Sequence, residues 1–305
     1  MRLWRDPGFA GPCVLVLGMF DGVHRGHQAL LMAGNALADR YDLPLNVCTF
    51  EPHPLQVLRP EIAPPLLTTL PERARLMASF GVDALCILHF DREVASEEPE
   101  EFLAMLEKVY QPRAMVCGFN YTFGKKGRGT AEMLRAWGEK HGCETVIVPA
   151  VELEGDTVSS TRIRGLLTQG DVQAAARLMG HWYSLSGRVG NGKQLGRTMG
   201  FPTANVEIPA RKALPAFGVY SCWLHTSRDV FPAVVNVGRH PTLPEGAVTV
   251  EAHVLDESLM LYGEKVRLDF LKFQRPERCF DSKDDLQQQI ARDADEARAY
   301  FASIE

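Results

Sequence analysis

The feature that most constrains the fold is an alternation of short apolar runs with longer amphipathic segments through the first 180 residues. Runs at 13–17, 45–50, 84–89, 114–117 and 145–148 are typical of buried parallel strands. Helical signals lie between them, such as Thr69 with Glu72 three residues later, the pattern of a capping box. Strands separated by helices require right-handed crossovers, so we predict an α/β doubly wound sheet.

The pattern changes after His181. Short β-rich runs at 184–189, 218–224, 233–237, 248–255 and 265–270 are separated by Gly and Pro, which predicts a small antiparallel barrel or sandwich. Two short helices are expected before it, at 161–167 and 172–179, the second ended by Gly180. A terminal helix from about Ser282 has one apolar face, made of Leu286, Ile290, Ala294, Ala297 and Phe301. The 305 residues are therefore predicted to form two domains, 1–181 and 182–305.

Composition and charge exclude several classes of protein. Acids outnumber Lys and Arg by 22 to 18 in residues 1–180 and by 16 to 15 in the rest, so electrostatic wrapping of a nucleic acid is not expected. The apolar stretch from residue 13 to 20 is far shorter than a membrane span, and no signal peptide is expected. Seven scattered cysteines without a CxxC argue against a disulfide framework or structural zinc site and favour the cytoplasm.

Residues 18–27, GMFDGVHRGH, carry the clearest chemical signal. They follow the first predicted strand and open the first predicted helix, where N–H groups and the helix dipole favour phosphate. Gly18, Gly22 and Gly26 let the backbone approach a triphosphate, and His24 and His27 can donate to its oxygens. A helix-capping pair or an incomplete metal pair is the alternative for the histidines. The preceding strand, Asp21 and the three glycines together favour a nucleotide site.

Two further segments point to phosphate or a planar ring. SSTRIR, at 159–164, places hydroxyls and Arg162 at another helix start, where they could clamp phosphates; an N-cap with solvated arginines is the alternative. GFNYTFG, at 118–124, leaves a strand for the basic, glycine-rich stretch 125–129. That loop could stack a ring and hold a phosphate, or could be an ordinary surface loop.

The β-rich half contains its own candidates. Thr203 and Asn205 lie two apart in an extended chain, and their neutral oxygens suit magnesium that carries bound phosphates. Alternation over 250–255 places Glu251 opposite the apolar positions, where its carboxylate could accept a proton from an attacking hydroxyl. Solvated polar positions are the alternative for both. The stretch 187–194 nearly matches a P-loop, but Gln194 replaces Ser or Thr and no regular helix follows, so we interpret the match as accidental.

The first half of the chain resembles a known family. GMFDGVHRGH, TFEPHP at 49–54, GFNYTFG and SSTRIR, in this order, resemble the FMN adenylyltransferase half of bacterial bifunctional FAD synthetases, which belong to the Rossmann-like HxGH nucleotidyltransferases. The resemblance implies that His24 and His27 are catalytic and contact ATP phosphates. It implies a nucleotide site made of Gly18, Phe20, Asp21, Gly22, Gly26, Ser159, Ser160, Thr161 and Arg162. It further implies a flavin site that includes Pro52, His53, Pro54 and Asn120.

The second half resembles the riboflavin kinase part of the same family. The matching stretches include GRTMGFPTAN, GVY, NVGRHPT, VEAHVLD, LYGEKV and QRPERCFDS. The resemblance implies a β-barrel in which Thr203 and Asn205 bind Mg²⁺ with the nucleotide and Glu251 is the catalytic base. It places Arg275 and Glu277 near the flavin. The chain departs from the family at two positions, where Asn191 replaces a common His and Leu243 replaces a common Phe.

The sequence therefore predicts a bifunctional cytoplasmic enzyme. Its C-terminal domain would convert riboflavin and ATP to FMN and ADP, and its N-terminal domain would convert FMN and ATP to FAD and diphosphate. Mg²⁺ is the expected cofactor, and the expected partners are these small molecules, not a nucleic acid or a membrane. Two alternatives are a single-function adenylyltransferase for another phosphate-bearing substrate, with a passive barrel, and a flavin-binding regulator without activity. The oligomeric state is left open.

Overall fold

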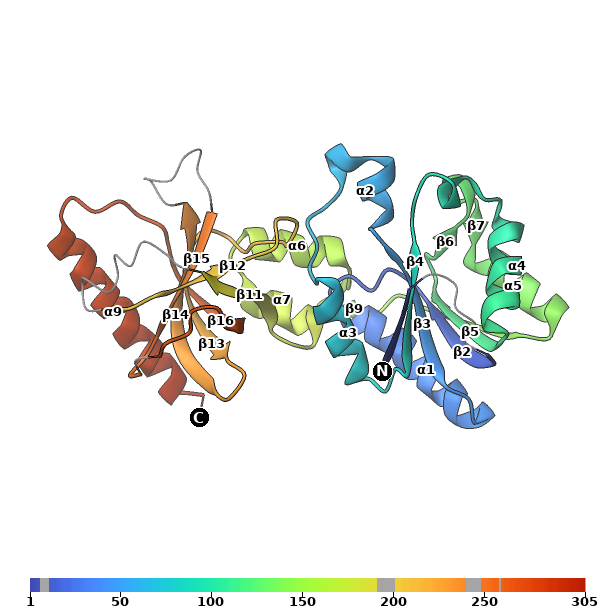
Figure 1. Cartoon of the computed structure of the whole chain (residues 1–305), viewed down its shortest axis with the longest axis horizontal. Helices are drawn as coiled ribbons and strands as arrows, with labels where there is room; N and C mark the ends of the chain where they lie inside the picture. The colour runs from blue at the N-terminus through green and yellow to red at the C-terminus, as the bar shows by residue number, and fades with distance from the viewer. Residues whose placement is uncertain (6–10, 191–200, 240–247, 258, 305) are drawn as a thin grey trace. The chain divides into compact units, whose positions relative to one another are not determined.

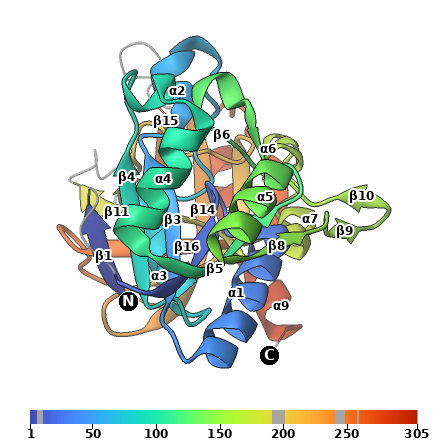
Figure 2. The same ribbon diagram turned by 90° about the vertical axis from the view of Figure 1, so that its right-hand side faces the viewer.

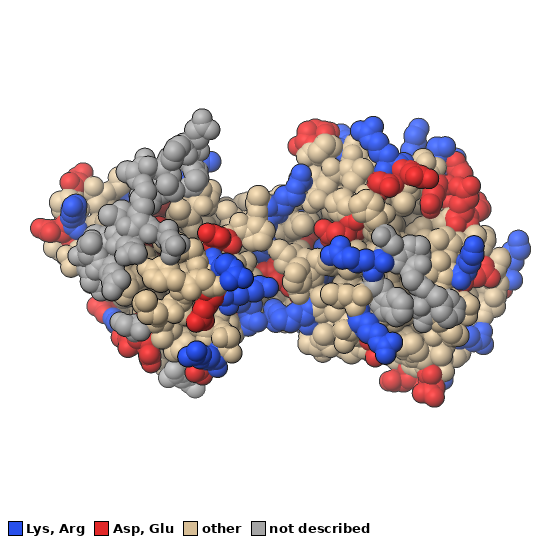
Figure 3. Space-filling view, viewed as in Figure 1, with Lys and Arg blue, Asp and Glu red and all other residues tan. Residues whose placement is uncertain are grey.

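A computed structural model describes residues 1–5, 11–190, 201–239, 248–257 and 259–304. The chain divides into two compact units, Met1–Ser160 and Thr161–Glu305, which are described one at a time. Each unit carries both acidic and basic side chains on the face shown in Figure 3. Within the described residues, no helix is long and apolar enough to cross a membrane.

The first unit is built on a six-stranded sheet in the order β1-β4-β3-β2-β5-β8, in which every pairing is parallel (Figure 1). Its strands are β1 (Arg2–Arg5), β2 (Cys13–Leu17), β3 (Leu45–Glu51), β4 (Ala84–His89), β5 (Pro112–Gly118) and β8 (Glu144–Val148). The five predicted strands are confirmed to within two residues at each end. The prediction missed β1, because this edge strand is short and Arg2, Leu3 and Arg5 in it are all exposed.

Helices cover both faces of this sheet, as a doubly wound fold requires. They are α1 (Arg25–Tyr41), α2 (Pro54–Leu58), α3 (Leu70–Ala78), α4 (Pro99–Tyr110) and α5 (Ala131–His141). Val14 and Val16 of β2 pack in one core with residues of α1 and α3, whereas Leu15 packs in a second core with residues of α4 and α5. Figure 2 shows α4 and α5 in front of the strands. The predicted capping box of Thr69 and Glu72 opens α3.

Short elements complete the first unit. They are the 3₁₀ turns η1 (Pro60–Ile62), η2 (Val94–Ser96) and η3 (Lys125–Gly127) and the hairpin strands β6 (Thr122–Phe123), β7 (Gly129–Thr130), β9 (Glu152–Leu153) and β10 (Asp156–Thr157). Lys125 and Arg128 of the basic loop both form ion pairs with Glu98, the N-cap of α4. These pairs hold the loop against the start of α4, so Lys125 and Arg128 have a structural role.

The second unit contains a closed antiparallel barrel in the order β11-β12-β15-β14-β13-β16. The strands are β11 (Tyr183–Gly190), β12 (Ala204–Glu207), β13 (Gly218–His225), β14 (Val230–Arg239), β15 (Val248–Val254) and β16 (Lys265–Pro276). The structure thus selects a barrel over a sandwich and adds the short strand β12, which the run pattern did not show. Residues 187–190, the start of the P-loop-like segment, lie in the antiparallel strand β11. A true P-loop follows a strand of a parallel sheet, so this position agrees with the interpretation of the match as accidental.

Three helices accompany the barrel, namely α6 (Ser160–Thr168), α7 (Val172–Met179) and α9 (Lys283–Ala302). Gly180 ends α7 in the left-handed conformation, as predicted. The apolar face of α9 has two parts. Ala294, Ala297 and Phe301 are buried in a core with barrel residues, whereas Leu286 and Ile290 line a cavity. The terminal helix therefore packs against the barrel and also forms part of a cavity wall.

Candidate active sites

The predicted phosphate and flavin segments of the first unit meet at one edge of the sheet. Strands β2, β3 and β5 are neighbours and parallel, so residues 18–27, 52–54 and 118–120 all follow carboxyl ends of adjacent strands. From β2 the chain runs to β3 and β4 on one side and then crosses to β5 on the other, so the carboxyl ends of β2 and β5 form the topological switch point where doubly wound sheets bind ligands.

The turn from β2 to α1 has an unusual backbone. Phe20, Gly22 and Val23 have positive φ values of 54°, 89° and 43°. Such values are uncommon for a residue with a side chain and rarer still for a β-branched one such as Val23. A Cβ on Gly22 would also stand 2.9 Å from the Leu67 side chain. Strained backbone of this kind persists where the surrounding structure enforces it, and it clusters at functional sites.

Asp21 holds this turn in place. Its carboxylate, 3% exposed, accepts hydrogen bonds from the backbone N–H groups of Leu67 at 3.1 Å and Thr68 at 2.9 Å. Gly22 N–H donates to the Thr68 hydroxyl at 2.9 Å. The carboxylate is thus directed at the segment before α3. A direct contact of Asp21 with a nucleotide stays a prediction.

His24 and His27 form a stacked pair at the start of α1. Their ring centroids lie 3.7 Å apart, and Nδ1 of His24 accepts from the His27 N–H at 3.3 Å as the N-cap. His24 Nδ1 is therefore an acceptor, which leaves the ring proton of the neutral form on Nε2. Burial, then the charges of His24 and Arg73, hold the pKa of His27 well below its usual range. Both the capping role and a phosphate-donor role suit this pair.

The second phosphate segment lies against the first. The Ser160 hydroxyl donates to the Asp21 carbonyl at 2.8 Å, although the two residues are far apart in sequence. A Cβ on Gly26 would stand 3.1 Å from the His24 ring and 3.7 Å from the Val158 carbonyl oxygen, so glycine permits this close packing. Ser159 precedes α6, and Ser160, Thr161 and Arg162 form its first turn.

The predicted flavin residues of this unit lie at loop positions on the same edge. Pro52, His53 and Pro54 are half-buried, and Nδ1 of His53 accepts from the Leu55 N–H at 3.2 Å to cap α2. Asn120 is exposed just beyond β5. A Cβ placed on Gly118 would stand 3.4 Å from its Oδ1.

Sequence reasoning missed Arg73 of α3. This side chain is 1% exposed, donates from Nη1 to the Met19 carbonyl at 2.9 Å, and places Nη2 3.5 Å from a Glu51 carboxylate oxygen. A signal was present, because Arg73 shares a helix face with the buried residues Leu76 and Met77 at i+3 and i+4. A cation on the apolar face of a helix indicates a buried polar partner.

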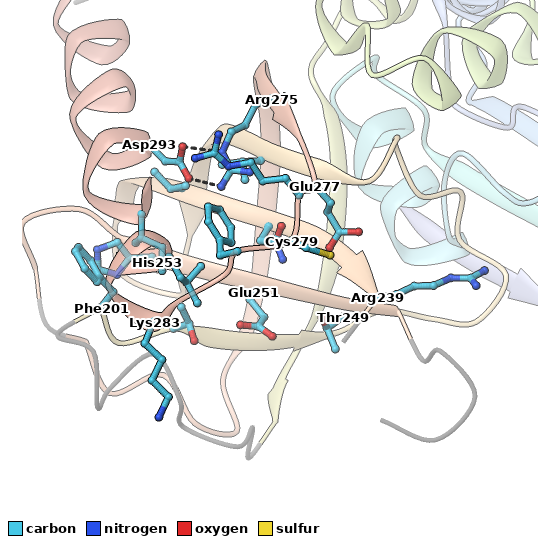
Figure 4. A pocket seen from close by; sticks show the side chains of 18 of the residues that line it. Phe201, Arg239, Thr249, Glu251, His253, Arg275, Glu277, Cys279, Lys283 and Asp293 are labelled. Carbon is cyan, nitrogen blue, oxygen red and sulfur yellow. Dashed lines mark hydrogen bonds and ion pairs between the residues drawn. The ribbon is translucent and has the colours of Figure 1, made fainter. Parts of the chain in front are cut away.

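The second unit contains a cavity of about 950 Å³ at the barrel, shown in Figure 4. Thr249, Glu251 and His253 of β15 line it, while the intervening residues Val250 and Ala252 are buried in the barrel interior. The predicted alternation that exposes the Glu251 carboxylate is therefore present. In Figure 4 Glu251 lies between His253 and Thr249 within this cavity.

Thr203 precedes β12 and Asn205 lies within it, next to the strand that carries Glu251. Thr203 lines the same cavity, and Asn205 pairs directly with Glu251 across β12 and β15. Directly paired side chains project from the same face of a sheet, which brings the Asn205 amide close to the carboxylate. Asn205 and Thr249 also line an adjoining hollow of about 500 Å³. Two neutral oxygens beside one carboxylate match the hard ligands that Mg²⁺ prefers.

His253 anchors the start of the segment that carries Thr203. Its Nδ1 lies 2.9 Å from the Pro202 carbonyl, which makes it the donor, and its ring meets Phe201 edge-on with centroids 5.4 Å apart. Among the described residues, no group of three or more His, Cys, Asp or Glu could hold a metal.

Arg275, near the end of β16, and Glu277, just after it, form part of the cavity wall. Arg275 binds Asp293 of α9 through two hydrogen bonds of 2.9 and 2.7 Å, drawn as dashed lines in Figure 4. Asp293 is 4% exposed, so this pair fixes α9 to β16. A Cβ on Gly238 would overlap the Glu277 carboxylate, so glycine makes room for that group.

Apolar side chains complete this wall, and one thiol lies among them. Val219, Val234, Phe280, Leu286 and Ile290 line the cavity and provide a surface that suits a planar ring, with Cys279 beside them. The two positions at which the sequence departs from the family, Asn191 and Leu243, lie outside the described residues.

A nucleotide-binding α/β unit joined to a barrel with a carboxylate-bearing cavity defines a class of two-domain nucleotide-dependent transferases. Comparison with known proteins identifies the family within this class. A family model described as FAD synthetase matches residues 7–162, and one described as riboflavin kinase matches residues 179–301. The chain belongs to the family of bifunctional riboflavin kinases and FMN adenylyltransferases. The order of the two activities along the chain is the predicted one.

Similar proteins cover nearly the whole chain. A bifunctional riboflavin kinase/FMN adenylyltransferase of Escherichia coli K12 is 37% identical over 95% of this chain and 93% of its own length. One of Listeria monocytogenes is 33% identical over 96% and 93%. A crystal structure described as a macrolide-efflux protein from Streptococcus pneumoniae has a TM-score of 0.89 at 34% identity, covering 98% of this chain and 99% of that one. The fold class predicted for both halves is confirmed.

Proposed function

We propose that the barrel cavity performs the riboflavin kinase reaction with Glu251 as general base. The Glu251 carboxylate accepts the proton of the ribityl 5′-hydroxyl as that oxygen attacks the γ-phosphate of ATP, giving FMN and ADP. The observation that supports this most directly is the presence of Glu251 and Thr203 in one cavity with an apolar wall. The isoalloxazine ring packs against that wall near Arg275 and Glu277.

Thr203 and Asn205 fit a magnesium ion carried by ATP. Both offer neutral oxygens, and Asn205 is the direct cross-strand neighbour of Glu251. When bound, Mg²⁺ offsets charge on the transferring phosphoryl group. His253 keeps the backbone of this segment in place through the Pro202 carbonyl.

In the first unit, His24 and His27 donate hydrogen bonds to the phosphates of a second ATP. The FMN phosphate attacks the α-phosphorus, FAD forms and diphosphate leaves. Gly18, Phe20, Gly22 and Gly26 line the nucleotide site through the backbone that Asp21 holds, and Ser159, Ser160, Thr161 and Arg162 bind the departing phosphates. Pro52, His53, Pro54 and Asn120 contact the flavin.

We place the boundary between the two catalytic domains at residues 181 and 182, just after the riboflavin kinase match begins at residue 179 and next to the first barrel strand. We assign the enzyme to the cytoplasm. The unpaired state of all seven cysteines supports this assignment, because thiols persist in a reducing compartment.

The test uses the full-length protein with riboflavin, ATP and Mg²⁺, with chromatographic separation of the flavins. Formation of FMN followed by FAD is the expected result. FAD from supplied FMN, with no FMN from riboflavin, would make the barrel a passive appendage. Flavin binding without either product would indicate a regulator. Replacing Mg²⁺ with EDTA should stop FMN formation, and persistence of the reaction would contradict the proposed metal.

A further inference from the structure

We propose that Arg73 is a positioning residue for the FMN adenylyltransferase reaction, acting through the strained turn at residues 18–24 and through His27. The inference rests on the proposed role of His27. Arg73 belongs to α3 and contacts the turn through the carbonyl of Met19, which is not among the predicted nucleotide-binding residues. Its effect is therefore assigned to the shape and charge of the site, not to contact with substrate.

The guanidinium holds the first part of the turn. Arg73 Nη1 donates to the Met19 carbonyl at 2.9 Å, and the Thr49 hydroxyl donates to the same oxygen at 3.3 Å. Asp21 is held at the same time by Leu67 and Thr68, immediately before α3. The segment from residue 67 to 73 thus fixes the turn at two points, on either side of Phe20, whose φ is positive. Such support is what a strained backbone requires.

Stability alone does not explain an arginine at this position. Arg73 is 1% exposed, and its Nε is buried with no hydrogen-bond partner in the described part of the chain. Burial lowers the pKa of Arg73, while Asp21 and Glu51 oppose that change. A buried ion pair often contributes no more than apolar residues of similar volume, and an unpaired buried donor is costly. A role in the site accounts for the retained charge.

The charge also acts on His27. The charged or titratable groups that influence His27 are His24, from the turn before α1, and Arg73, from α3. Asp21 and Glu51 act on Arg73 from the turn and from β3. Burial is the main cause that keeps the His27 imidazole neutral, and the charges of His24 and then Arg73 act in the same direction, because a positive neighbour disfavours a second positive charge. The neutral His27 ring then offers one N–H donor.

The test compares Arg73→Met with Arg75→Met, the same change on the exposed side of the same helix. We expect FAD synthesis from FMN to fall about 100-fold in R73M, the cost associated with a small displacement of positioned groups. R75M should match the unmodified enzyme. An equal loss in both variants, or none in R73M, would overturn the proposal. FMN formation from riboflavin should be unchanged in both.

The pH profile separates positioning from a merely structural role. The limb of the FAD synthesis profile that disappears in His27→Asn reports the titration of His27. Removing the Arg73 charge should move this limb to higher pH, because loss of a neighbouring positive charge raises the pKa of an imidazole. R73Q should show the same shift even if R73M does not fold, and R73K should leave the limb in place while lowering kcat. A limb at the same pH in R73Q and R73K would overturn the proposal.

Failure of the inference is distinguishable from failure of the proposed site. If His27→Ala retains full FAD synthesis, the assignment of His27 is wrong and the inference fails with it. If His27→Ala abolishes FAD synthesis while R73M and R73Q behave as the unmodified enzyme, only the role of Arg73 is wrong. Thermal unfolding of each variant establishes that the loss of activity does not come from loss of fold.

Discussion

The candidate phosphate sites of the two units are built from different parts of the chain, backbone in one and side chains in the other. In the α/β unit the candidate site is a backbone turn with three positive φ values, held from behind by buried polar side chains and followed by two stacked imidazoles. In the barrel the candidate site is a set of side chains on alternating strand positions around an open cavity. The first site depends on backbone shape, and the second depends on the chemical identity of single side chains. Substitutions of different kinds should therefore break them.

The largest expected effect is in the barrel. Glu251→Gln keeps the size and hydrogen-bonding capacity of the side chain but removes its basicity. We expect the rate of FMN formation to fall about 10²–10⁴-fold, the usual contribution of a general base. FAD formation from supplied FMN should remain at the level of the unmodified enzyme, which provides the internal control. A variant that forms FMN at the normal rate would show that Glu251 is not the base.

The reciprocal substitution is His27→Ala in the α/β unit. Loss of one positioned donor to a phosphate in a buried site should reduce FAD formation by about 10²–10³-fold. Riboflavin phosphorylation should continue, so that FMN accumulates in the combined assay. His141→Ala, at the far end of α5, is the matched control, since its imidazole pairs with Glu107 and takes no part in the proposed site. If both activities fall together in His27→Ala, the two-site comparison is wrong.

Backbone substitutions should distinguish the units next. Gly22 has a φ of 89°, and a Cβ there would stand 2.9 Å from Leu67, whereas Gly263 of the second unit has a φ of 75° with open space around it. Gly22→Ala should destabilise its unit by about 1–2 kcal/mol and reduce FAD formation, because strain and a clash act together. Gly263→Ala should destabilise its unit only through the positive φ, because no neighbouring atom would clash with the added Cβ. Unfolding followed by circular dichroism, with both activities measured, makes the comparison. Equal effects would mean that the shape of the turn is not special.

Hydrophobic periodicity in the sequence predicted most of the helices and strands, because an element with a buried face repeats apolar residues at a regular spacing. The runs that became β2 and β4 were placed to the residue, and α7 with its Gly180 end was placed in the same way. Strand β1 escaped because it is exposed. The alternation around Glu251 was sufficient to predict its orientation, since a strand fixes the direction of each side chain.

The support beneath the phosphate turn could not be predicted in this way. Asp21 is bound by backbone N–H groups of Leu67 and Thr68, and any residue at those positions provides such groups. Arg73 meets a backbone carbonyl of Met19. When a side chain binds a distant backbone group, the residue type at the partner position is not constrained. Such contacts therefore cannot be predicted from the sequence and are seen only in the folded structure.

The smallest effect concerns the flavin wall of the cavity. All seven cysteines lie in the described part of the chain; six are buried and Cys279 is exposed. Burial raises the pKa of Cys13 to about 12 and that of Cys86 to about 11, so these thiols hold little reactive thiolate near neutral pH. A thiol reagent should therefore modify one group per folded chain, and Cys279→Ser should abolish that reaction.

Riboflavin should slow the modification of Cys279 several-fold if the ring packs against the wall formed by Phe280, Leu286 and Ile290, because the bound ring would cover the neighbouring thiol. FMN should protect in the same way, since it carries the same ring system. ATP alone should protect less, because its proposed contacts, Thr203 and Asn205, are not part of this apolar wall. Protection by ATP but not by riboflavin would reverse the two subsites within the barrel, while leaving Glu251 between them.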